Sequence, residues 1–130
     1  MSAASDYLEL KLLDHVLGNT TFSQPASRYL GLFTASTGLE TNSPSAEVSG
    51  GSYVRKAVSF AAASSGSSAT SATVTFDTAT ANWGTITHVA VMDASTSGNV
   101  LFWGAVTTSK VIESGDTFQV SSGNLTISLA

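Results

Sequence analysis

The chain contains no cysteine and only two prolines among its 130 residues. Without cysteine it can form neither a disulfide nor a thiolate metal site, and its redox compartment is left open. Charge is scarce as well, because 11% of the residues are charged against about a quarter in an ordinary soluble domain. About three residues in ten are Ser or Thr, so hydroxyl groups supply much of the polarity of the surface.

Basic residues are few and scattered along the chain: Lys11, Arg28, Arg55, Lys56 and Lys110. The formal net charge is −4. A nucleic-acid backbone requires a clustered positive patch, which this spacing does not provide. The composition therefore argues against nucleic acid as a partner.

Long apolar runs are also missing. The opening residues, MSAASDYLE, contain neither the basic segment nor the apolar segment of a secretory signal peptide. No stretch approaches the ~20 apolar residues that span a bilayer as a helix. We therefore expect a soluble protein that is made in the cytoplasm and has no membrane partner.

Motifs that carry chemistry are absent from the sequence. It has no G-x-S-x-G nucleophile turn, no Walker loop and no dinucleotide fingerprint. His15 and His88 have no neighbours at a metal-ligand spacing, and His88 is expected to be a hydrogen-bonded strand residue. We expect no enzyme: no catalytic residue, no metal and no cofactor. Carbohydrate binding through aromatic rings is a distant alternative, because Trp83 is expected to lie in the core.

The sequence does contain a series of short strands joined by Ser, Thr and Gly. β-branched and aromatic runs predict strands at residues 28–35, 53–60, 73–76, 86–93, 99–106, 117–120 and 124–129. The first of these is apolar at both alternating sets of positions, which predicts a strand covered on both faces. The segment AAASSGSSATS, residues 61–71, reads as a linker or flexible hairpin loop. The predicted fold class is mainly β, an antiparallel β-sandwich or barrel-like domain with one N-terminal α-helix. We expect one domain over residues 1–130, with its β part at about 28–130.

The one predicted helix covers about residues 5–17. Ser5 or Asp6 can cap its start, and Gly18-Asn19 supplies a stop. Its apolar residues form a wide arc for so short a helix: Tyr7, Leu8, Leu10, Leu12, Leu13, Val16 and Leu17. Such a helix is marginal alone in water and needs cover. It either packs on its own sheet or docks partly on a neighbouring subunit.

The polar segment Ser36–Gly51 reads as a long loop, and long loops in compact domains tend to be functional or disordered. Its part Thr37–Gly51 is the best candidate for a contact loop, and Ser64–Ser71 is a further candidate. The contact loop and the helix give the predicted partner contacts: Leu39, Glu40, Thr41, Asn42, Pro44, Glu47, Tyr7 and Leu10.

Six sequence blocks in a fixed order carry a family resemblance: SAASDYLELKLLDHVLGNTTF, YLGLFTAST, EVSGGSYVRKAVSF, FDTATANWGTITHVAVMD, GNVLFWGAV and GDTFQVSSGNLTIS. Together they resemble a family of small tailed-bacteriophage virion proteins, often named phage tail fiber protein, over nearly the whole chain. The resemblance implies a structural component of the virion that is made in the host cytoplasm. Some similar small β proteins of cyanobacterial phages act as cement proteins on the outside of the capsid. The resemblance carries over no functional residues.

Size favours cement over fibre. A compact chain of this length has a radius of gyration near ~14 Å, and the sequence has no heptads or β-helix repeats from which a shaft could be built. The prediction is a capsid cement or decoration protein, a symmetric homo-oligomer that bridges subunits of the major capsid protein. The alternative is a tail or baseplate component that binds tail proteins, either a fibre adaptor or a receptor-binding tip. Deleting Thr41–Ser49 is expected to leave a folded domain that no longer binds phage heads.

Overall fold

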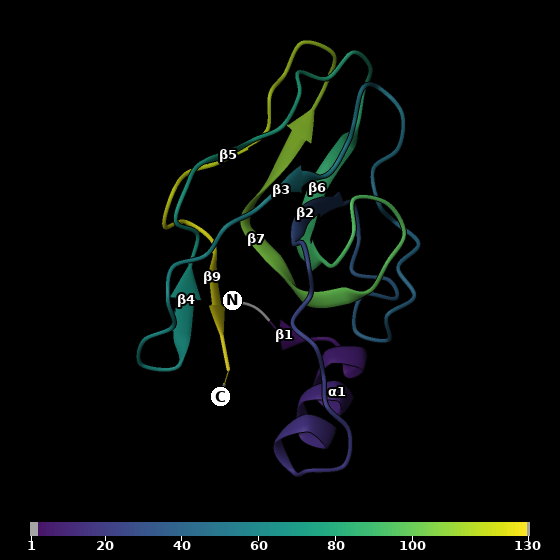
Figure 1. Ribbon diagram of the computed structural model, residues 1–130. Helices are drawn as coiled ribbons and strands as arrows, with labels where there is room; N and C mark the ends of the chain where they lie inside the picture. Colours follow the sequence, from purple (N-terminus) through teal and green to yellow (C-terminus); the bar gives the residue numbers. More distant parts are fainter. Residues whose placement is uncertain (1–2, 130) are drawn as a thin grey trace.

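A computed structural model describes residues 3–129 of the chain. It is mainly β, with one helix near the N-terminus (Figure 1), as predicted. The elements follow in the order β1 (Ala3–Ala4), α1 (Asp6–Val16), β2 (Tyr29–Phe33), β3 (Lys56–Ala57), β4 (Ser67–Ala69), β5 (Val74–Thr75), β6 (Gly84–Met92), β7 (Val100–Ile112), β8 (Gln119–Val120) and β9 (Thr126–Ser128).

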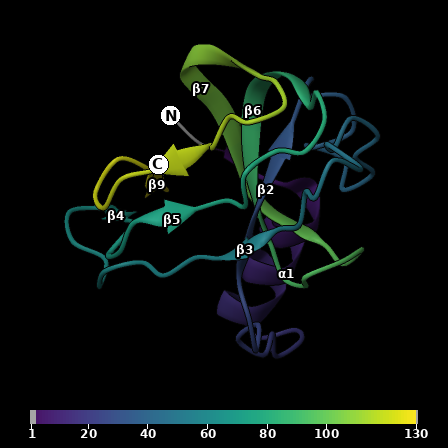
Figure 2. The same cartoon turned by 90° about the horizontal axis from the view of Figure 1, so that it is seen from above.

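A five-stranded antiparallel sheet forms the centre, in the order β1-β7-β6-β2-β3. The two longest strands form an antiparallel hairpin, in which β6 pairs with β7 from Gly84↔Ile112 to Met92↔Val100. Two short ribbons, β4-β9 and β5-β8, complete the β structure. Seen from above, the ribbons lie to one side of the large sheet (Figure 2).

Strand β2 is covered on both faces, as its sequence predicted. Leu30 and Leu32 belong to the larger apolar cluster, while Phe33 belongs to a second cluster with Ala90 and Met92 of β6. Because alternate residues of a strand point to opposite faces, the two clusters lie on opposite sides of the sheet. The protein therefore needs a covering layer on each side of this sheet.

Helix α1 begins where its cap is held by the sheet. The buried hydroxyl of Ser5 accepts a hydrogen bond from the backbone N–H of Leu8 and donates one to the carbonyl of Val100 in β7. The backbone N–H of Ser5 also donates to the carbonyl of Leu101 at 3.0 Å. The cap thus fixes the first turn of α1 against the sheet while it satisfies a free N–H of that turn.

Three segments differ from their predictions. Of the strand expected at residues 53–60 only Lys56–Ala57 forms, while residues 61–71, expected to be a linker or loop, contain β4. Strand β7 extends to Ile112, six residues beyond the predicted end. Each difference depends on a partner that is distant in sequence, such as Thr126–Ser128 for β4. Local propensity does not contain that information.

Candidate docking surface

Four large apolar side chains of α1 point into solvent. The exposed fractions are 64% for Leu10, 56% for Leu13, 74% for Val16 and 72% for Leu17. At 100° per residue these four side chains share one side of the helix, which we call the outward face of α1. Fully burying each of them would contribute about 1.5–3 kcal/mol, so this face is a strong candidate for contact with another protein.

The opposite side of α1 holds it to the domain. Leu8 is buried, with 5% of its surface exposed, and Leu12 packs partly against the same cluster. The segment after the helix folds back along it, because Phe22 meets the ring of Tyr7 edge-on at 6.4 Å and its backbone N–H donates to Nδ1 of His15 at 3.0 Å. The helix therefore packs on its own domain along one side and leaves the other side uncovered.

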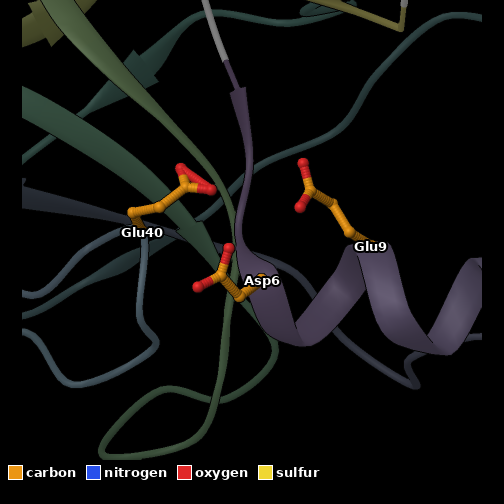
Figure 3. Close-up of side chains that lie close together, drawn as sticks. All are labelled: Asp6, Glu9 and Glu40. Carbon is orange, nitrogen blue, oxygen red and sulfur yellow. The ribbon is translucent and has the colours of Figure 1, made fainter.

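Three carboxylates lie together beside the outward face (Figure 3). Asp6 and Glu9 come from the first turn of α1, and Glu40 comes from the loop between β2 and β3. One carboxylate oxygen of each lies within 4.8 Å of the other two. The backbone N–H of Asp6 donates to the carbonyl of Glu40 at 2.8 Å, and Nε1 of Trp103 donates to the Glu40 carboxylate at 3.0 Å. Within residues 3–129 both ion pairs, Arg55–Glu47 and Lys56–Asp77, involve other groups. The acidic cluster therefore gives this end of the helix a negative charge that no basic side chain of the described chain neutralises.

The predicted contact loop is built into the fold. Leu39 is fully buried in the second apolar cluster. The side-chain oxygen of Asn42 accepts from the backbone N–H of Val100 at 2.7 Å, and its amide donates to Asn99 at 2.9 Å. The backbone N–H of Val48 donates to the carbonyl of Leu32 at 3.0 Å. The expectation that Thr41–Ser49 can be deleted without loss of the fold is therefore wrong, because this loop is the cover of one face of the sheet.

Glu47 binds inward as well. Its carboxylate accepts two hydrogen bonds from the guanidinium of Arg55 and one from the hydroxyl of Tyr53, each at 2.7 Å. The hydrogen bonds to Glu47 raise the pKa of Arg55. Burial first, and then the hydrogen bond to Glu47, raises the pKa of Tyr53 far above its ordinary value. This network ties the end of the loop to residues 53–55.

The structure sorts the predicted contact residues by position. Leu39, Asn42 and Glu47 have internal partners, as described above, and so does Glu40, whose carboxylate accepts from Trp103. Glu40 is half-buried at the surface, and the other four residues are exposed or half-buried on the helix or the loop: Thr41, Pro44, Tyr7 and Leu10. Their contact with a partner stays a prediction. The sequence analysis did not place Leu13, Val16, Leu17, Asp6 or Glu9 in this surface, although the wide apolar arc of the helix was the signal for the first three.

Two other predictions are confirmed. The ring of Trp83 is buried and its Nε1 donates to the carbonyl of Gly51 at 2.9 Å. His88 is a half-buried residue of β6 whose Nδ1 lies 2.8 Å from the hydroxyl of Thr87.

No helix within residues 3–129 is both long and apolar enough to cross a membrane.

The two sides of α1 predict opposite outcomes for the same substitution. Leu8→Ala should lower the free energy of unfolding by about 2–5 kcal/mol, because it leaves a cavity in the core. Leu13→Ala should change it by about 0.5 kcal/mol or less, because that side chain is exposed. Urea unfolding of both variants measures the difference, and equal losses would contradict the orientation of the helix.

The loop predicts a steric effect at Gly38. A Cβ added there would lie 1.9 Å from the carbonyl oxygen of Ser43, at a φ of +77°. A Cβ at Gly50, with a φ of +75°, would meet nothing within 4 Å. Gly50→Ala should therefore cost only the backbone strain, about 1–2 kcal/mol, whereas Gly38→Ala should cost clearly more. Comparable unfolding midpoints of the two variants would show that the loop is not packed as described.

The Tyr53 network predicts a loss of stability in alkali. A group whose pKa is raised on folding stabilises the protein below its unfolded pKa, and this contribution is lost as the pH rises above that value. Stability should therefore fall above pH 10.0, the ordinary pKa of tyrosine. In Tyr53→Phe this part of the decline should disappear, although the variant is less stable at neutral pH because Glu47 and the N–H of Leu32 lose a partner. Unfolding midpoints measured across this pH range test it, and identical alkaline slopes would contradict the assignment.

No curated protein matches the sequence. The sequence does match a family described as Podophage GP4 fiber I protein gp80, over residues 3–128. The match includes α1 with its outward face, the contact loop and every strand of the sheet. The family resemblance seen in the sequence is thereby confirmed, and the chain belongs to this family of small, fibre-related structural proteins of the bacteriophage virion.

Proposed function

We propose that the protein is a compact subunit of a phage tail-fibre assembly, placed as an adaptor or a tip. Two observations support this proposal. The family to which the chain belongs carries the description of a phage fibre protein. The outward face of α1 leaves Leu10, Leu13, Val16 and Leu17 without cover in the isolated chain, which is costly in water and suits a subunit that functions within an assembly.

The fold limits what such a subunit can do. Its longest element is β7, with 13 residues, and that strand lies within a sheet that packs on both faces. The chain has neither heptads nor repeated strand units that could extend along an axis. A long shaft would therefore come from other proteins, and this chain would join or end it.

A capsid cement or decoration role is the second candidate. It is favoured by the compact fold and by an uncovered apolar face, because many weak contacts repeated over a shell bind strongly through avidity. In that case the major capsid protein would be the partner, and binding only to the mature shell would stabilise it. In either role the virion is the location, and the exposed or half-buried residues Glu40, Thr41 and Pro44 are proposed to contact the larger partner. The proposal involves no catalysis, cofactor, nucleic acid or membrane.

The copy number per virion distinguishes the two roles. Quantitative mass spectrometry of purified particles would compare this chain with the major capsid protein. The fibre proposal predicts a few per cent of the capsid subunit or less. A ratio of the same order as the capsid subunit would instead support decoration of the shell, and complete absence from particles would contradict both.

A further inference from the structure

A groove lies beside the free edge of β7. One part has a volume of about 570 Å³ and lies between β7 and residues 117–127, and an adjoining part of about 360 Å³ reaches β4 and β9. The two parts share Val91, Phe102 and Ile127 as lining residues. The smaller part is lined almost wholly by apolar surface, whereas the larger part has both apolar and polar lining. The groove therefore offers apolar surface that a second protein can cover.

The course of β7 accounts for the groove. On its outer edge β7 pairs with β1 only at Phe102 and Trp103. On its inner edge the pairing with β6 shifts between His88↔Ala105 and Ile86↔Lys110, so that residues 106–109 of β7 stand opposite Thr87 alone. Such a bulge bends the strand and interrupts its ladder. The chain that returns through β8 and β9 makes ribbons with β5 and β4 and does not pair with this edge of β7.

The charged side chains that line the groove are basic. Its charged lining residues are Lys110 in the larger part and Arg28 in the adjoining part, and no carboxylate is among the described residues that line it. The outward face of α1 is the converse, since its apolar side chains lie next to the carboxylates of Asp6, Glu9 and Glu40. One chain therefore carries an uncovered apolar helix face with acidic groups and an uncovered, partly apolar groove with basic groups.

We propose that the outward face of α1 of one copy packs into the groove of a second copy. Leu10, Leu13 and Leu17 would enter the space between β7 and residues 117–127. The acidic first turn of α1 would then meet Lys110 or Arg28, the basic groups that line the groove. This inference specifies a partner for the surface on which the proposed function rests.

The arrangement predicts a directional contact. Helix and groove occupy different parts of the chain. In Figure 1 α1 lies below the sheet, whereas the groove is lined by β7 and residues 117–127. Two copies that exchange this contact reciprocally form a two-fold dimer with two helix–groove contacts. Copies that give the helix to one neighbour and the groove to another form a closed ring or an open chain.

Sedimentation velocity of designed variants tests the contact. The helix variant, Leu13→Glu with Leu17→Glu, keeps the groove, and the groove variant, Val106→Glu, keeps the helix. Leu13 and Leu17 are exposed in the single chain and Val106 is a half-buried lining residue of the groove, so circular dichroism checks that each variant folds. Val54→Glu is the control, because Val54 is an exposed apolar residue outside both surfaces (51% exposed).

Wild type and the control should associate with rising concentration, while each designed variant alone should associate at least about 100-fold more weakly. An equimolar mixture of the two variants should form a dimer and nothing larger, because it contains one intact helix–groove contact. Lys110→Glu should weaken association about tenfold and Lys110→Gln less, which keeps the test valid if the groove variant does not fold.

Three results would overturn the inference. Wild type could remain monomeric up to its solubility limit. The groove variant, correctly folded, could associate as well as wild type, which would indicate pairing of helix with helix. The mixture of variants could remain monomeric. None of these results bears on the copy number per virion, so the proposed function would fail or stand independently.

Discussion

The central sheet imposes the main constraint on this protein, because its strands β2 and β6 are apolar on both faces. Leu30 and Leu32 on one side and Phe33 on the other require cover from two separate layers. A chain of 130 residues with one short helix has few segments left to cover two faces of a sheet. Which segment packs on which face determines which apolar surfaces remain exposed.

One layer is made from a loop. Leu39 supplies the apolar cover, and Asn42 and Glu47 bind the loop to the neighbouring strands. The other layer is made from two short ribbons and residues 74–83 and is less complete, so that a groove remains beside β7. Helix α1 is attached at the edge of the sheet by Leu8 and the Ser5 cap, and it covers neither face with its outward side. The uncovered helix and the incomplete layer are two consequences of the same shortage of cover.

Much of this architecture could be predicted from local patterns. The helix, the two-faced strand β2 and the β6–β7 hairpin follow from apolar periodicity, and the buried Trp83 follows from its position at the start of β6. The packed loop could not be predicted, because its order depends on Asn42 reaching Val100, 58 residues away. The groove and the acidic cluster also depend on long-range placement, since Glu40 and Asp6 are distant in sequence and are brought together by the fold.

The central claim is that the outward face of α1 is exposed in the single chain and covered in the virion. Hydroxyl-radical footprinting of Leu13 and Leu17 tests it directly, with dilute free protein compared with purified particles. The account predicts strong labelling of both residues in the free chain and strong protection in the particle, with the buried Leu8 protected in both. Equal labelling of Leu13 and Leu17 in the two states would contradict it.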